Sequence, residues 1–149
     1  MEQRTQAEVE EERDVLTAEV MGAVSIDWGP VGNRGYRDCA GVSGLDGLSH
    51  TRQTIGPPVQ DREGVAREIL ALVEDAGYPV HLIHRDNEKP PAWVVESQDG
   101  TWYFRISFRT TGTVITADTR CFPWDDDVDG PPLQHTTSPT PTPSATPPQ

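Results

Sequence analysis

The sequence predicts an α+β domain, in which an antiparallel meander of three or four strands is packed by two helices and carries one disulfide. Three observations predict it. Apolar residues recur at helical spacing in two segments, and they alternate with polar residues along several short segments of the second half. Proline and hydroxyl residues replace them near the C-terminus. We therefore assign residues 1–129 to a single α+β domain and residues 130–149 to a disordered Pro/Ser/Thr-rich tail.

Length and charge limit the class of protein. The 149 residues suffice for one domain, and 24 acidic against 12 basic side chains give a net charge of −12. This charge repels nucleic acid phosphate and anionic lipid surfaces. The apolar stretches are too short for a membrane span or for the core of an export signal. We expect a monomer that binds no nucleic acid, takes no cofactor and carries neither a transmembrane segment nor an export signal in this chain.

The first predicted element is a helix that begins near Thr5 and weakens at Gly22. Thr5 and Glu8 have the spacing of a capping box. Its acidic N-terminal half is expected to be a solvated surface near the favourable end of the helix dipole. The apolar residues at helical spacing are Val9, Leu16, Val20 and Ala23.

Residues 28–58 predict a long irregular loop. Glycines at 29, 32, 35, 41, 44 and 47 share a three-residue phase, but Asp38 breaks the run and proline is sparse, which excludes a collagen-like helix. Long irregular loops in small domains often bind ligands. This loop contains Cys39.

The second predicted helix begins after Asp61, which can cap it, and ends at Gly77, followed by Pro79. Its apolar residues form one stripe. They are Val65, Ala66, Ile69, Leu72, Val73 and Ala76.

The meander follows this helix, with strands predicted around 80–84, 93–98 and 113–121. Asp99-Gly100 is a strong signal for a two-residue hairpin. The implied inward pairs are Val95 with Phe104 and Trp93 with Ile106, and a turn near Thr111-Gly112 then pairs Phe108 with Ile115 and Ile106 with Ala117. The same parity places Cys121 on the inward face beside Trp102, and Trp93 and Trp102 are expected in the core.

Cys39 and Cys121 are 82 positions apart, one in the loop and one at the end of the last strand. This arrangement predicts a disulfide that attaches the loop to the sheet, as expected of an exported protein. Two unpaired buried thiols are the alternative, because an even cysteine count is weak evidence of pairing.

Asp125, Asp127 and Asp129, followed by Gly130, match the opening of a calcium loop. The twelfth position is Thr136 instead of glutamate, so we expect an acidic solvated linker, with weak calcium binding as the alternative. Metal binding at the histidines is not expected, because an offset of three sends His81 and His84 to opposite faces of a strand.

Catalysis is not indicated either. The chain has no nucleophile elbow and no dinucleotide or Walker glycine pattern after a strand. Trp28 and Trp124 lie in loops near the two cysteines, where they either cover the disulfide or form an exposed binding surface.

The order of elements resembles the small exported lipoproteins of actinomycete bacteria of the LppA-like kind, over roughly Thr5 to Pro123. In such proteins the helix typically closes on a glycine and an aromatic residue, here Gly77-Tyr78, and the final strand runs into a cysteine and a proline, here Cys121 and Pro123. The chain departs from them in having no export signal or lipid-bearing cysteine before the domain, and in its Pro/Thr tail. The resemblance implies a cell-envelope location and a non-catalytic role, without a known ligand.

The leading hypothesis is therefore a non-enzymatic extracytoplasmic domain, in the cell envelope or secreted, that binds an unknown protein or envelope component or serves a structural role. The alternative is a soluble cytoplasmic acidic protein that binds or blocks a basic protein partner. An undetected hydrolase is a weaker third hypothesis.

Overall fold

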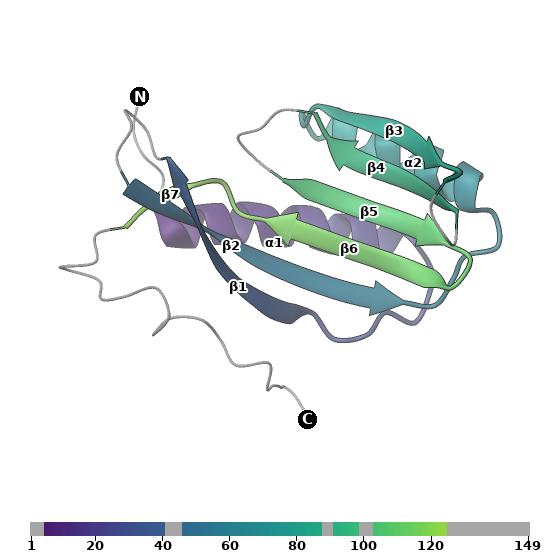
Figure 1. Ribbon diagram of the computed structural model, residues 1–149, viewed down its shortest axis with the longest axis horizontal. Coiled ribbons are helices and arrows are strands. Elements are labelled where there is room, and N and C mark those ends of the chain that lie inside the picture. The colour runs from purple at the N-terminus through teal and green to yellow at the C-terminus, as the bar shows by residue number, and fades with distance from the viewer. Residues whose placement is uncertain (1–4, 41–45, 88–90, 99–102, 125–149) are drawn as a thin grey trace.

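The computed structural model describes residues 5–40, 46–87, 91–98 and 103–124. Within these ranges two helices cover one face of a seven-stranded antiparallel sheet with the strand order β1-β2-β6-β5-β4-β3, and β7 pairs with β2 (Figure 1). The elements are α1 (Gln6–Ala23), β1 (Gly32–Ala40), β2 (Asp46–Gly56), α2 (Arg62–Asp75), β3 (Val80–Arg85), β4 (Ala92–Ser97), β5 (Phe104–Arg109), β6 (Gly112–Asp118) and β7 (Phe122–Pro123). The α+β class is confirmed.

Helix α1 begins with the predicted capping box, in which Thr5 and Glu8 each accept a hydrogen bond from the other's backbone N–H. Val9, Leu16 and Val20 are buried as predicted. Ala23 is exposed, and Val24 is buried after the helix ends.

Helix α2 also begins at its predicted cap, because the side chain of Asp61 accepts from the N–H of Gly64. Gly77 has a φ of 97°, a left-handed conformation that favours glycine directly after a helix. Neither helix in the described part of the chain combines the length and the apolarity needed to cross a membrane.

The main core lies between both helices and the central strands. Leu16 and Val20 of α1 and Ile69 and Val73 of α2 pack on buried residues of the sheet. The inner face of the sheet is built by Val80, Val95, Phe104, Ile106, Phe108, Ile115 and Ala117. A second, smaller cluster joins Val9, Leu48 and Phe122.

The prediction of a long irregular loop over residues 28–58 was wrong, because this segment contains β1 and β2. Its inward positions are largely polar: His50 and Arg52 of β2 face Arg13 and Asp14 of α1. Apolar alternation, the signal for a half-buried strand, is therefore missing although both strands are paired.

The inward face of the meander was predicted correctly, but its register was wrong by two residues at both turns. Ile106 pairs with Val95 and with Ile115, and Phe104 pairs with Ala117. Strand β4 ends at Ser97 and β5 begins at Phe104, so the first connection is longer than a two-residue turn. The second turn has the predicted length of two residues but lies one position earlier than predicted, because Arg109 pairs with Gly112. A shift of two preserves the face of every side chain, so the hydrophobic pattern alone cannot detect it.

Candidate functional site: the open face of the sheet

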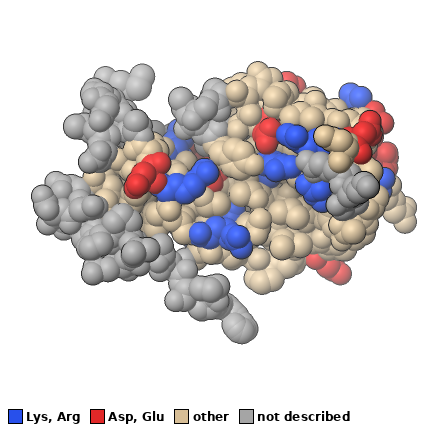
Figure 2. All heavy atoms as spheres, in the orientation of Figure 1, with Lys and Arg blue, Asp and Glu red and all other residues tan. Residues whose placement is uncertain are grey.

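The side of the sheet away from α1 and α2 is lined mostly by polar and charged side chains; we call it the open face (Figures 1 and 2). Its strand positions follow from the register, since paired residues share a face and alternate residues return to it. The open face includes Arg37, Ser49, Thr51, Gln53, Ile55, His81, Ile83, Arg85, Ala92, Val94, Glu96, Tyr103, Arg105, Ser107, Arg109, Val114, Thr116 and Asp118.

The charge of the open face is opposite to that of the whole chain. These positions hold four arginines and two carboxylates, whereas the chain carries −12. Lys and Arg side chains gather on this face in the space-filling view (Figure 2). The acidic residues that outnumber them must lie elsewhere in the chain.

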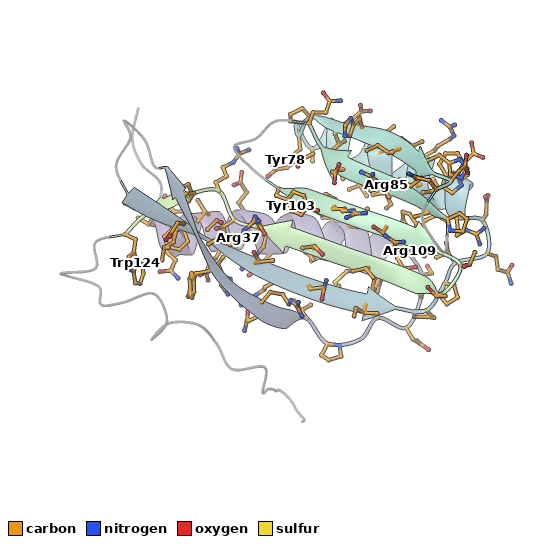
Figure 3. The ribbon with its side chains drawn as sticks, viewed as in Figure 1. Arg37, Tyr78, Arg85, Tyr103, Arg109 and Trp124 are labelled. Atoms are coloured by element: carbon orange, nitrogen blue, oxygen red, sulfur yellow. A yellow bond between two sulfur atoms is a disulfide. The ribbon has the colours of Figure 1, made fainter. Side chains whose placement is uncertain are left out.

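Three of these arginines, Arg85, Arg105 and Arg109, lie at the β3–β5 side of the open face, which we call the arginine end. Arg85 and Arg109 lie in one row, with Ala92 of β4 between them (Figure 3). The carboxylate of Glu96 lies 3.8 Å from Arg85 Nη2 and 3.9 Å from Arg105 Nε. One carboxylate thus faces two guanidinium groups, and the local charge stays positive.

Arg37 lies at the other side of the open face, beside β6 (Figure 3). Its guanidinium forms an ion pair with the carboxylate of Asp118 and lies 5.9 Å from the ring centre of Tyr103. Asp118 is 2% exposed and also accepts a 2.6 Å hydrogen bond from Thr51. Arg37 itself is 61% exposed, so the pair orients a solvent-accessible cation over an aromatic ring.

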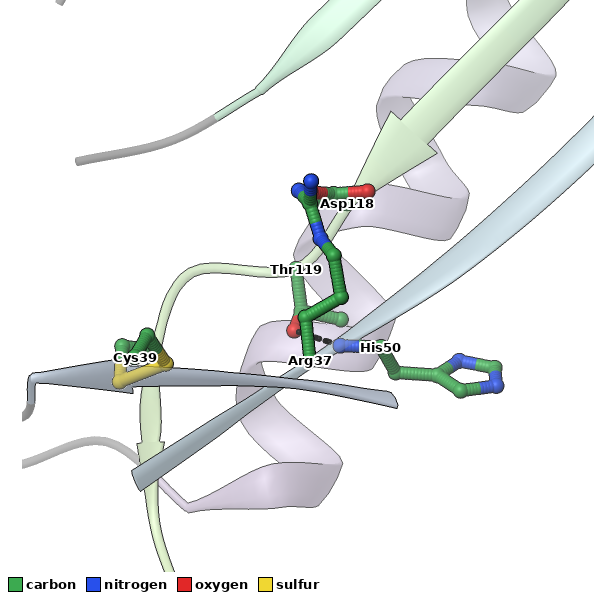
Figure 4. Close-up of a disulfide and its surroundings, with 6 residues drawn as sticks. Arg37, Cys39, His50, Asp118 and Thr119 are labelled. Carbon is green, nitrogen blue, oxygen red and sulfur yellow. Dashed lines mark hydrogen bonds and ion pairs between the residues drawn. A yellow bond between two sulfur atoms is a disulfide. The ribbon is translucent and has the colours of Figure 1, made fainter. Parts of the chain in front are cut away.

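A disulfide joins Cys39 to Cys121 where β1, β2 and β7 converge, with the two Cα atoms 6.0 Å apart (Figure 4). A Cβ at Gly47 would lie 2.6 Å from Cys121 Sγ, so only glycine fits beneath the bond. The predicted pairing is confirmed. The predicted place of Cys121 is wrong, because it follows β6 and bonds to Cys39, which shares the side of Arg37 on β1 and is not on the inward face.

The inner side of this region contains a buried polar pair, Arg13 and His50, which are 2% and 3% exposed. Arg13 Nη1 lies 3.0 Å from His50 Nδ1 and donates to the backbone oxygen of His50. Since a guanidinium only donates, Nδ1 must accept and the imidazole must be neutral. Burial, and then the charge of Arg13, lower the pKa of His50 to about 4.

A groove of about 490 Å³ lies on the helix side, between α1 and the turn after α2. It is lined by Glu8, Glu11, Glu12, Glu19, Val15, Leu16, Ala76 and Tyr78. Tyr78 donates a hydrogen bond to Glu12, which also pairs with Arg120. The acidic and the basic surfaces of the domain thus lie on different layers.

The two loop tryptophans lie at opposite ends of β2 and do not form one surface. Trp28 packs on the main core near Gly56, and its indole N–H donates to the backbone oxygens of Met21 and Val24. Trp124 packs beside Tyr36 and Phe122, near the disulfide (Figure 3).

Several other predicted residues lie outside the described ranges. They are the calcium candidates Asp125, Asp127 and Asp129, the core candidate Trp102, the hairpin Asp99-Gly100 and the tail 130–149. Among the described residues, no group of three or more His, Cys, Asp or Glu side chains is placed to hold a metal ion. His81 and His84 lie on opposite faces of β3, beside Glu96 and against Trp93 respectively.

Sequence reasoning missed the arginines of the open face, although a signal for them exists. In β5, Arg105, Ser107 and Arg109 alternate with Phe104, Ile106 and Phe108. This alternation places two arginines on the face opposite the core. Only the register across the strands adds Arg85 and Arg37 to the same surface.

Comparisons with known proteins leave the function open. No protein-family model matches the chain, and no curated protein matches it in sequence. Among solved structures, it is similar to a DUF4853 family protein from Actinomyces odontolyticus, with 12% identity and a TM-score of 0.45 over 81% of this chain and 67% of the other. This similarity is distant, and neither the fold nor the site described above depends on it.

Proposed function

We propose that the chain is a non-enzymatic extracytoplasmic domain of the cell envelope or of a secreted protein, and that it binds its partner through the open face. The observation that carries the binding role is the set of arginines held in register on a sheet face that neither helix covers. Arginine and tyrosine are enriched in protein interfaces, and both lie on this face.

The extracytoplasmic location is supported by the disulfide between Cys39 and Cys121, since such bonds persist in oxidising compartments. The resemblance to LppA-like envelope lipoproteins agrees with that location. A non-enzymatic role is supported by the described histidines, which all have structural neighbours: His50 beside Arg13, His81 beside Glu96 and His84 stacked on Trp93.

A second candidate function is that of an acidic protein that binds or blocks a basic partner. The groove lined by four glutamates and the exposed Val15 of α1 favours it. The two candidates use opposite layers of the domain, which makes them separable by experiment.

Location is tested by dissolving cells of the native host in denaturant that contains an alkylating reagent and no reductant, and then measuring the mass of the chain. We expect no alkylated cysteine. Two alkylated cysteines would contradict the proposal of an extracytoplasmic domain that contains this disulfide.

The binding surface is tested by amide chemical shifts of the labelled protein with poly-L-glutamate and, separately, with poly-L-lysine. We expect poly-L-glutamate to shift amides of β3, β4 and β5. Shifts confined to α1 with poly-L-lysine would favour the basic-partner function instead.

A further inference from the structure

We infer that the open face binds an acidic segment of a partner protein in which carboxylates are interspersed with apolar side chains. This inference rests on the proposed function, because it names the partner chemistry of the same surface. It follows from how charged and apolar residues are arranged in rows across the strands.

An apolar row crosses the open face between two charged rows. Same-face residues along a strand are about 6.8 Å apart, so the outer rows are separated by roughly 13 Å. One charged row is Arg85, Ala92 and Arg109; the apolar row is Ile83, Val94, Ser107, Val114 and Ile55; the other charged row is His81, Glu96, Arg105, Thr116 and Gln53. A ligand that spans these rows meets at least one arginine on each side of an apolar strip.

Exposure shows where an apolar group can bind. Ile55 is 57% exposed, and Val114 and Ile83 are half-buried, whereas Val94 and Ser107 are covered. The accessible apolar surface therefore lies at the two ends of the row. A row with accessible apolar ends, lying between rows that contain arginines, is suited to an amphipathic polypeptide more than to a uniformly charged polymer.

The charge of the whole chain argues against a polyanion with a phosphate or sulfate on every unit. A net charge of −12 repels such a ligand at long range, and only the local field of the arginine end attracts it. A short acidic segment suffers less repulsion and gains from apolar contact. The basic residues are eleven arginines and one lysine, and arginine binds carboxylates through two parallel hydrogen bonds.

The arginines of this surface already interact within the domain. Arg85 and Arg105 lie near Glu96, and Arg37 pairs with Asp118. A partner carboxylate therefore adds to or exchanges with these contacts, and its binding should weaken steeply as salt is raised.

The test uses the full chain and two fluorescent twelve-residue peptides of equal charge, Glu-Leu-Glu-Thr repeated three times and Glu-Ser-Glu-Thr repeated three times. Anisotropy at 50 mM NaCl measures their dissociation constants, with a twelve-nucleotide oligothymidylate as a third probe. We expect the leucine peptide to bind about tenfold more tightly than the serine peptide and than the oligonucleotide, because only it buries apolar surface.

Matched variants locate the binding. Arg105→Glu should reduce affinity for the leucine peptide at least tenfold, whereas Arg67→Glu on α2, outside the open face, should not. Ile55→Asp should remove the preference for leucine, whereas Val15→Asp on α1, with a similar exposed fraction of 53%, should leave it intact. Amide shifts of each variant confirm that it is folded.

Each outcome has a consequence. Equal binding of the two peptides on the open face would overturn the inference and leave the proposed function standing, and tighter binding of the oligonucleotide would do the same. If the leucine peptide binds only to a chain that ends at Trp124, the occupant of the open face is the acidic segment 125–129 of this chain. If the chain dimerises and Arg105→Glu abolishes the dimer, the occupant is a second copy of the chain. If neither peptide binds and poly-L-glutamate shifts no open-face amide, both the inference and the proposed function fall.

Discussion

The two halves of the sheet are stabilised in different ways. In the apolar half, β3, β4, β5 and β6 pack with α2 over large buried side chains such as Phe104, Ile106 and Phe108. In the polar half, β1, β2 and β7 pack with the first turns of α1 over a small cluster of Val9, Leu48 and Phe122. There the disulfide and the Arg13–His50 pair lie beside the apolar contact. The comparison shows that a disulfide can stabilise the packing of strands that bury little apolar surface.

Removing the disulfide should have the largest effect on the polar half. For Cys39→Ala with Cys121→Ala, the chain-entropy model for an 82-residue separation gives a loss of about 4.5 kcal/mol in the free energy of unfolding. Urea denaturation of the variant and of the wild type measures it. The wild type in reductant should match the variant, and the variant should not respond to reductant; a loss below about 1 kcal/mol would mean that the polar half does not depend on the bond.

The second-largest effect is expected from truncating core side chains, which should lower the free energy of unfolding more in the apolar half than in the polar half. Ile106→Ala, in the middle of the main core, is expected to lower the free energy of unfolding by roughly 3.5 kcal/mol. Leu48→Ala, in the small cluster, should cost nearer 2 kcal/mol, because fewer neighbours surround the cavity. Equal losses in urea denaturation would erase the distinction between an apolar and a polar half.

Acid should weaken the polar half through His50. Its pKa is about 4 in the folded domain against an ordinary 6.5, so the unfolded chain binds the proton first as pH falls. Stability from this group is complete above pH 6.5 and is lost between 6.5 and 4, up to about 3 kcal/mol.

The groups that face His50 are Arg13, Arg52, Glu10, Asp14 and Tyr36, so the carboxylates add a pH dependence of their own. The measurement is therefore the difference in urea midpoint between the wild type and His50→Gln from pH 7 to pH 4. The variant should show the shallower decline; parallel curves would contradict a neutral buried imidazole.

The smallest effects should come from the helix caps, one for each half. Thr5→Ala and Asp61→Ala each remove a side chain that accepts from the first turn of a helix, and each should cost about 1 kcal/mol. Thermal unfolding followed by circular dichroism measures both. Similar losses of stability in the two variants would mean that the halves differ in how their strands pack. A much larger loss for Thr5→Ala would mean that the difference also involves the stability of α1.

The predictability of the fold follows the same division. Both helices and their caps could be predicted from the sequence because their signals are local: Thr5 with Glu8, and Asp61 before an apolar stripe. The strands of the meander were readable from alternation, but a register shift of two leaves alternation unchanged. Strands β1 and β2 were missed because their inward side chains contact an arginine and an aspartate on α1, a pairing visible only after the chain has folded.

The candidate site was less predictable than the fold. The disulfide could be inferred from two cysteines, but the open face depends on which strands are neighbours. Arg85 and Arg109 come together only because β4 separates them by a single small residue, Ala92. A positive surface on a chain of charge −12 is therefore a product of topology and not of composition.

Strand β2 gives the domain a particular order of assembly. Its hydrogen-bonding partners are β1, close to it in sequence, and β6 and β7, which end at Asp118 and Pro123. The sheet therefore cannot close until nearly all of the folded part has left the ribosome, and its two cysteines meet only at that stage. Through most of its synthesis, a growing chain of this topology therefore has β1 and β2 exposed along the edge that β6 and β7 later occupy.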